Sequence, residues 1–158
     1  MSRLESFLRR LTAQRNGLNW AASQISGVSG DALELGLGSG RSYDHMRATI
    51  SKRRIWVIDR ALDCHPSCTP PAADFLEGDA EDMLCRLAGQ NVKLAVAHYD
   101  FGIGVKDLDI SEATALSPFI ARVMAPDGVL LSSQPLVGFN RVEGPADISP
   151  DRYWFYRN

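Results

Sequence analysis

The residues best suited to chemistry form a glycine-rich loop, residues 34–41, with the sequence ELGLGSGR. Three glycines at alternate positions permit a tight turn and leave the backbone open to a ligand, because no Cβ stands in the way. The loop follows a short apolar run and precedes a helix-like segment, the context that a nucleotide-binding loop requires. The start of such a helix presents unpaired N–H groups and a partial positive charge. The spacing is G-x-G-x-G, whereas a dinucleotide fingerprint reads G-x-G-x-x-G.

Polar and acidic residues stand at the ends of the next apolar runs, which we interpret below as strands. Asp59 ends the second run, Asp79 follows the third, and His98, Tyr99 and Asp100 end the fourth. An acidic side chain placed like Asp59 accepts hydrogen bonds from both ribose hydroxyls of an adenosine cofactor. Because ligands bind beyond the carboxyl ends of strands in open α/β sheets, these side chains are predicted to surround one site.

With these motifs, the sequence resembles the class I methyltransferases that depend on S-adenosylmethionine (SAM), whose first motif is acidic-x-G-x-G-x-G. The resemblance implies SAM as the cofactor, with the adenine amino group on Asp79 and the adenine ring on the backbone N–H of Ala80. It also implies that the residues after the fourth run face the sulfonium and the methyl acceptor. The cofactor-binding residues are predicted to be Glu34, Gly36, Gly38, Ser39, Gly40, Asp59, Arg60, Asp79, Ala80 and Trp20.

The catalytic residues are predicted to be His98, Tyr99 and Asp100. Methyl transfer from a sulfonium needs an aligned nucleophile and exclusion of water. A base helps where the nucleophile carries a proton. We therefore assign the base to Asp100 or His98 and the positioning of the acceptor to Tyr99.

Structural roles compete with each of these assignments. The three glycines also fit a plain strand–helix turn. Glu34 either caps neighbouring N–H groups or reaches the methionine end of the cofactor indirectly, and Asp59 and Asp79 are suited to cap the helices that follow them. Trp20 either covers the cofactor or packs between helices, and packing is the commoner role. The polar residues after the fourth run are equally suited to be ordinary strand-end residues.

The chain alternates short apolar runs with helix-like segments, which predicts βαβ units and a parallel sheet. We expect a doubly wound, mostly parallel α/β fold of the Rossmann-like methyltransferase type, with right-handed crossovers. The predicted strands are residues 32–35, 55–58, 74–77, 92–97, 129–132 and 153–156, and the predicted helices between them are residues 42–51, 80–88 and 111–124.

An amphipathic helix is predicted ahead of this core, because Leu4, Phe7, Leu8 and Leu11 recur at helical spacing. Gly17 is expected to interrupt it.

The length of 158 residues fits one domain, predicted as residues 1–158 with a helical extension, 1–30, and an α/β core, 31–158. The resembled family has seven strands, with a helix before its final hairpin. Residues 134–152 are too few for a helix plus a full strand. One strand is therefore expected to be missing or vestigial.

The charge and hydropathy of the chain limit the classes of partner that it is expected to bind. The net charge of −2 argues against binding nucleic acid through a general positive field. No proline-aromatic motif follows Asp100, so an amino-methylating DNA enzyme is not indicated. No apolar stretch approaches the roughly 20 residues that span a bilayer. The N-terminus is too charged for a signal peptide, so we expect a cytoplasmic protein without a membrane partner.

The three cysteines do not predict a disulfide framework. Residues 64–68, CHPSC, offer only three metal ligands and lack the second cluster that zinc sites need. No metal is therefore expected.

The predicted function is methyl transfer from SAM to an unidentified small-molecule acceptor. Residues 2–30, 101–109 and 137–150 are available to contact the acceptor, and residues 101–104 form a loop suited to gating. A non-catalytic SAM- or nucleotide-binding module is one alternative, since fold alone does not establish catalysis. An NAD(P)-dependent oxidoreductase is the other, although the glycine spacing differs from its fingerprint. A symmetric homodimer is the default assembly.

Overall fold

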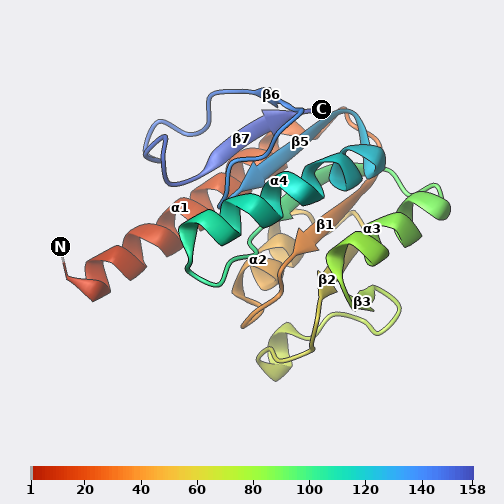
Figure 1. Cartoon of the computed structure of the whole chain (residues 1–158), viewed down its shortest axis with the longest axis horizontal. Helices are drawn as coiled ribbons and strands as arrows, with labels where there is room; N and C mark the ends of the chain where they lie inside the picture. The colour runs from red at the N-terminus through yellow and green to blue at the C-terminus, as the bar shows by residue number, and fades with distance from the viewer. Residues whose placement is uncertain (1) are drawn as a thin grey trace.

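The computed structural model describes residues 2–158, which form a seven-stranded sheet with two helices on each face (Figure 1). Each predicted strand overlaps an observed one, so the prediction of a doubly wound α/β fold is confirmed. The helices are α1 (Arg3–Gln24), α2 (Arg41–Thr49), α3 (Ala80–Gly89) and α4 (Lys106–Val123), with a 3-10 helix, η1 (Pro66–Cys68). The strands are β1 (Asp31–Leu35), β2 (Ile55–Asp59), β3 (Phe75–Glu77), β4 (Leu94–Tyr99), β5 (Met124–Ser132), β6 (Asn140–Arg141) and β7 (Trp154–Arg157).

The strand order places a ligand site at the centre of the sheet. The order is β3-β2-β1-β4-β5-β7-β6, and β7 is antiparallel to both of its neighbours. The chain order reverses between β1 and β4, and such a switch point opens a crevice at the carboxyl ends of the strands. In the register of these two strands, Glu34 lies beside His98. Two polar residues are therefore neighbours at the point where a ligand is expected.

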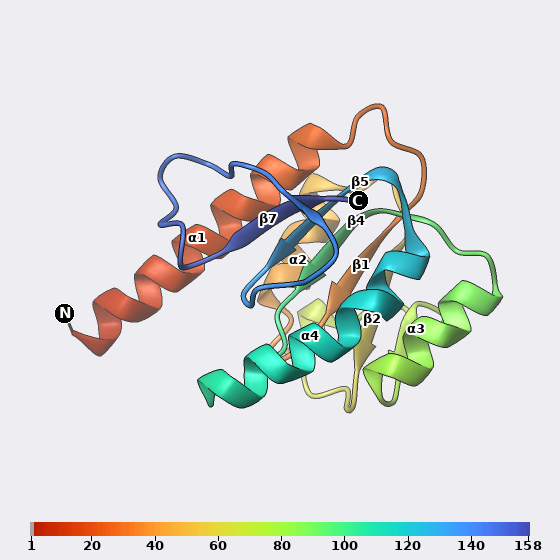
Figure 2. The same ribbon diagram turned by 45° about the horizontal axis from the view of Figure 1, so that its top comes forward.

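The two faces of the sheet have separate cores. Helices α1 and α2 pack on one face, and α3 and α4 pack on the other. Figures 1 and 2 show α4 and α3 together on one side, with α1 and α2 behind the strands. Because side chains alternate along a strand, His98 and Tyr99 in β4 point to opposite faces. Tyr99 belongs to the core beneath α3 and α4, whereas His98 contacts residues on the side of α1.

Helix α1 is continuous over 22 residues, so the expected interruption at Gly17 is wrong. A capping box begins the helix: the Ser2 side chain accepts from the Glu5 N–H, and the Glu5 carboxylate accepts from the Ser2 N–H, both at 3.1 Å. A Cβ at position 17 would lie 3.2 Å from Cδ1 of Leu131 and 3.3 Å from the ring of Phe155. The helix approaches the sheet so closely at Gly17 that even a Cβ would have to displace these side chains by a few tenths of an ångström.

The apolar face predicted at the start of α1 is not part of the core. Leu4, Phe7 and Leu8 are exposed, because the first turns of the helix extend beyond the sheet (Figure 1). The buried face begins further along, at Ala13, and continues to Ala21.

The C-terminal edge of the sheet contains the strand that was expected to be missing or vestigial. Strand β6 consists of two residues and pairs with β7. Within the described residues, no helix lies between β5 and β7. Residues 142–153 instead form a loop beside α1 (Figure 2), where the Asn16 amide donates to the Asp147 carboxylate. The loop returns the chain to the carboxyl ends of the central strands.

Helix α4 begins at Lys106 rather than at the predicted Ser111. The buried Asp109 carboxylate accepts from the N–H of Ile103 at 2.8 Å and of Gly104 at 3.1 Å. These bonds fix the end of the loop after β4 against the first turn of α4. The loop after β4 that was expected to contact the acceptor, residues 101–109, is therefore shorter than predicted, whereas residues 101–104 remain outside the helix.

Candidate functional site

A cavity of about 340 Å³ lies beyond the carboxyl ends of β1, β2 and β4. Its volume falls in the usual range of small-ligand sites, roughly 300–1,000 Å³. The glycine loop forms one wall, and α1 and the residues after β4 form the others. Five predicted site residues line it: Gly36, Gly38, Ser39, Asp59 and Asp100. The structure thus brings the glycine loop, the acid after β2 and the acid after β4 around one space.

The backbone of the glycine loop requires glycine where it borders the cavity. Gly36 has a φ of +95°, and a Cβ there would lie 3.1 Å from the backbone of Asp100. Gly38 has a φ of +48°, and a Cβ there would meet no atom within 4 Å. Gly38 therefore presents bare backbone to open space. Gly40 provides the N-cap of α2 and has no side chain to cover the first N–H groups of the helix.

Asp59 holds the glycine loop in place. One of its carboxylate oxygens, Oδ2, accepts from the N–H of Leu37 at 2.7 Å and from that of Gly38 at 3.2 Å. The other oxygen, Oδ1, accepts from the N–H of Arg60 at 2.7 Å. The carboxylate also lines the cavity. Asp59 can therefore fix the loop and still face a ligand.

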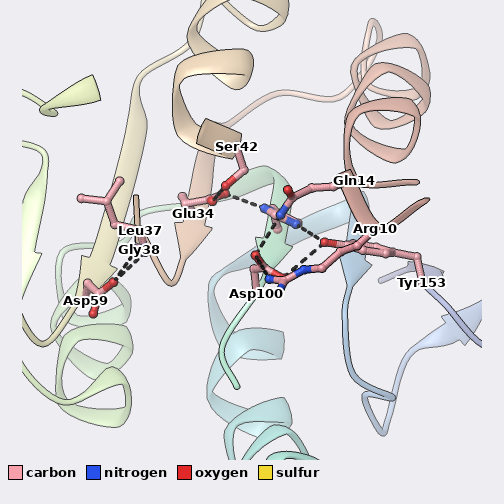
Figure 3. Close-up of polar contacts among 10 residues, drawn as sticks. Arg10, Gln14, Glu34, Leu37, Gly38, Ser42, Asp59, Asp100 and Tyr153 are labelled. Atoms are coloured by element: carbon pink, nitrogen blue, oxygen red, sulfur yellow. Dashed lines mark hydrogen bonds and ion pairs between the residues drawn. The ribbon is translucent and has the colours of Figure 1, made fainter. Parts of the chain in front are cut away.

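A buried polar network begins at Glu34, as Figure 3 shows. The Ser42 hydroxyl donates to Oε1 of Glu34, and Oε2 of Glu34 lies 2.7 Å from Nδ1 of His98. The Glu34 and His98 side chains are both 0% exposed. Nε2 of His98 lies 3.1 Å from the hydroxyl of Tyr153, which is also buried. Glu34 is thus linked to the cavity directly by Ser42, which lines it, rather than by its own side chain.

The network ends at Asp100, where it meets the cavity (Figure 3). The Tyr153 hydroxyl donates to Oδ1 of Asp100 at 3.3 Å, and the Gln14 amide donates to Oδ2 at 2.8 Å. Nη2 of Arg10 lies 3.5 Å from the same Oδ2. The Asp100 side chain remains 13% exposed, so one end of the network is open to a ligand.

The network sets the protonation of its buried members. Burial alone would lower the pKa of His98, but the charge and hydrogen bond of Glu34, with the charge of Asp100, outweigh it and raise that pKa. Burial, with the charges of Asp100 and Glu34, raises the pKa of Tyr153 well above its ordinary value. Tyr153 therefore stays protonated at neutral pH, and His98 is a favourable place to hold a proton.

Tyr99 lies away from this network. It is 1% exposed and packs edge-to-face on Phe101, with the ring centroids 5.5 Å apart. Its hydroxyl is buried and has no hydrogen-bond partner within residues 2–158. Burial, with the charges of Glu112 and Asp109, raises the pKa of Tyr99. The structure brings His98 and Asp100 together and places Tyr99 on the opposite face of the sheet.

The remaining predicted cofactor residues lie outside the cavity. The Arg60 guanidinium and the Asp79 carboxylate form an ion pair at 3.2 Å, with side chains 76% and 68% exposed. Asp79 is the N-cap of α3 but makes no side-chain capping bond, and Ala80 begins that helix. Trp20 packs edge-to-face on Phe155 in the core, with the ring centroids 4.9 Å apart.

Four members of the polar network were not found from the sequence: Arg10, Gln14, Ser42 and Tyr153. Gln14 had a signal, because it interrupts the buried face of α1 with a polar side chain. Tyr153 was predicted only as the first residue of the last strand, although a buried tyrosine hydroxyl usually has a hydrogen-bond partner. Ser42 follows the glycine loop directly. Arg10 had no signal, since it is one of several arginines on an exposed helical face.

The segment of residues 64–68, which contains two of the cysteines, packs against the end of the glycine loop. Cys68 packs against Gly40, where a Cβ would lie 2.5 Å from the Cβ of Cys68. The three cysteines are free. The described residues contain no group of three side chains suited to hold a metal ion. No helix in the described part of the chain combines the length and apolarity needed to cross a bilayer.

Comparison with known proteins identifies the family. Residues 1–158 match the family described as S-adenosyl-L-methionine methyltransferase. The chain belongs to this SAM methyltransferase family. A crystal structure of the S-adenosyl-L-methionine methyltransferase from Silicibacter pomeroyi DSS-3 is 33% identical, with a TM-score of 0.93 over 99% of this chain and 98% of that one. No curated protein matches significantly.

More distant SAM methyltransferases share the fold. The TDP-rhamnose 3'-O-methyltransferase CalS11 of calicheamicin biosynthesis is 15% identical, with a TM-score of 0.65 over 98% of this chain and 81% of that one. Human methyltransferase-like protein 13, solved with S-adenosylhomocysteine (SAH), is 11% identical, with a TM-score of 0.53 over 97% and 79% of the two chains. Family membership confirms the resemblance and the SAM cofactor, and it decides against the oxidoreductase alternative.

Proposed function

We propose that this SAM methyltransferase binds its cofactor in the cavity beyond β1, β2 and β4 and methylates a small molecule beside Asp100. One observation carries the proposal: the glycine loop and the open end of a buried proton-holding network face the same 340 Å³ cavity. The loop is suited to bind the cofactor, and the network is suited to receive a proton from the acceptor.

The residues around the cavity fit SAM. Gly38 offers bare backbone next to open space, and Asp59 offers a carboxylate to the ribose hydroxyls. When bound, SAM supplies an electrophilic methyl group on a sulfonium, whose electron pair stays with sulfur as the methyl group leaves. Asp79 and Ala80 remain our prediction for the adenine end, and Arg60 remains a predicted cofactor-binding residue; all three would lie at the exposed edge outside this cavity. We leave Trp20 out of the site because it packs in the core.

Asp100 is the proposed base, and His98 acts through the network rather than by touching the acceptor. A bond forms between the acceptor atom and the methyl carbon, and the proton of that atom passes to the Asp100 carboxylate. With His98 neutral and its one proton on Nδ1 facing Glu34, Nε2 is free to accept, and the Tyr153 hydroxyl can turn from Asp100 to Nε2, give its proton there and take the proton held by Asp100. The proton then rests on a histidine whose pKa is raised beside Glu34. Tyr99 is not part of this path.

A small acceptor is supported by the small cavities around Asp100. One protein of the same fold acts on TDP-rhamnose. We also propose that the chain acts as one SAM-binding domain, since both the cofactor site and the base lie in it. A cytoplasmic location and a homodimer remain predictions from the sequence.

The test is a calorimetric titration with SAM, SAH and NADH, followed by an assay for SAH release from SAM. We expect both adenosyl ligands to bind and NADH not to bind. Asp59→Asn should weaken SAH binding by about tenfold or more, as expected for lost hydrogen bonds to a charged group. The matched control is Asp82→Asn, which removes an exposed carboxylate in α3. Absence of SAH binding to the wild type would overturn the proposal.

A further inference from the structure

A second cavity, of about 220 Å³, adjoins the first beyond the carboxyl ends of β4 and β5. Arg10, Asp100, Phe101 and Gly102 line both cavities. A molecule in the second cavity therefore lies next to the proposed base and next to the cofactor cavity. No motif in the sequence pointed to this space, because its walls come from the start of α1, the loop after β4, the turn after β5 and the residues before β7.

Arg152 is the group that gives this cavity its chemistry. It lines the cavity and is half-buried. Its backbone is fixed on both sides, since its N–H donates to the carbonyl of Ser149 at 2.9 Å and Tyr153 follows it into the core. Within residues 2–158, its guanidinium has no hydrogen-bond or ion-pair partner. A half-buried guanidinium on an anchored backbone, with its donors free, is suited to bind a carboxylate or a phosphate.

The acidic groups in the same walls already have partners. Both oxygens of Asp109 accept from backbone N–H groups of the loop before α4. Asp100 accepts from Tyr153, Gln14 and Arg10. Neither carboxylate is paired with Arg152. The cavity therefore has a free cation on one wall and the proposed base on another.

We infer, on the basis of the proposed function, that this cavity binds the methyl acceptor and that the acceptor is a small anion. Its carboxylate or phosphate group binds Arg152, and its hydroxyl or amine faces Asp100. Bidentate hydrogen bonds from a guanidinium are charge-assisted and directional, so they also orient the nucleophile. The neighbouring side chains of Ser133 and Gln134 line the cavity and add polar groups for the anionic end.

The experiment is a calorimetric titration of the SAH-saturated protein with three probes: benzoate, phenyl phosphate and the neutral isostere benzamide. We expect at least one of the two anions to bind saturably and benzamide to bind at least about tenfold more weakly, as for a lost charge-assisted bond. Which anion binds more tightly tells whether the site favours a carboxylate or a phosphate. Arg152→Gln should abolish the preference of the cavity for the anions over benzamide. Arg86→Gln, which removes an exposed arginine from the last turn of α3, should leave it unchanged.

The outcomes separate this inference from the proposed function. If SAH fails to bind the wild type, the cofactor site itself is wrong. If SAH binds equally to the wild type and to Arg152→Gln, the cofactor site stands, and the anion titrations decide the inference. Failure of both anions to bind, equal binding of benzamide, or an unchanged preference in Arg152→Gln would each overturn it.

Discussion

Replacement of Tyr153 by phenylalanine removes one hydroxyl group from the centre of the buried network. That hydroxyl lies 3.3 Å from Oδ1 of Asp100 and 3.1 Å from Nε2 of His98. A hydrogen bond to a charged group contributes about 1.5–3 kcal/mol to stability, and a neutral one contributes about 0.5–1.5 kcal/mol. The first distance is longer than the usual O–H···O bond, roughly 2.5–3.0 Å, and the second is near the long end of the range for bonds to nitrogen, so each bond is taken at the weak end of its range. We therefore expect Tyr153→Phe to lower the free energy of unfolding by about 2–3 kcal/mol.

A matched control is available three residues further along the chain, in β7. The Tyr156 hydroxyl is also buried, but it makes one neutral hydrogen bond, accepted from the N–H of Leu136 at 2.9 Å. Tyr156→Phe should therefore cost only about 1 kcal/mol. Urea unfolding measures both changes, and for a chain of this length Tyr153→Phe should lower the Tm by about 4–12 °C.

The same variant tests the proton path. The rate of methyl transfer should fall in Tyr153→Phe, while SAH affinity should stay close to that of the wild type, because the hydroxyl faces the network rather than the cofactor cavity. The reasoning is refuted if Tyr153→Phe is no less stable than Tyr156→Phe. It is also refuted if SAH release continues at the wild-type rate with an unchanged pH profile.

Two further predictions concern packing and pH. Gly17→Val should destabilise the protein by about 1–3 kcal/mol, since its side chain would overpack the contact between α1 and the sheet. Gly27→Val, at a position open to solvent, should leave urea unfolding nearly unchanged, and equal effects at both positions would contradict the packing argument. Because the folded pKa of His98 is raised, its contribution to stability is complete below its ordinary pKa of 6.5 and disappears as pH rises through the folded pKa. The stability difference between wild type and His98→Gln should therefore shrink with rising pH, and a difference that stays constant or grows would contradict this reasoning.

The fold could be predicted from the sequence because each strand and loop has a local pattern, an apolar run or a cluster of glycines. The apolar runs that end at Leu35 and Ile58 became central strands, and the glycine loop lies between β1 and α2 as expected. Gly17 was misinterpreted for a physical reason. A glycine that breaks a helix and a glycine that lets a helix approach a sheet look the same until the packing partner is known.

The site was only partly predictable, because its remaining members come from distant parts of the chain. Asp59 and Asp100 were recognisable, since a residue that ends a parallel strand must lie at the ligand edge of the sheet. Gln14 and Tyr153 reach Asp100 from sequence separations of 86 and 53 residues. Nothing near them in sequence indicates that contact. Burial of His98, and its separation from Tyr99 across the sheet, likewise depended on the strand register.

Gln14 and Tyr153 both donate hydrogen bonds to Asp100, and these long-range contacts affect when the site is completed during synthesis of the chain. Long-range contacts form late, because the chain must close large loops before it gains from them. A ribosome-bound chain can already pair β1, β2 and β4 and form the glycine loop while its last strand is still being made. Such a chain has the elements of a cofactor site, but Asp100 and His98 lack the tyrosine that joins them. On the proposed mechanism, the proton path is therefore the last part of the site to form.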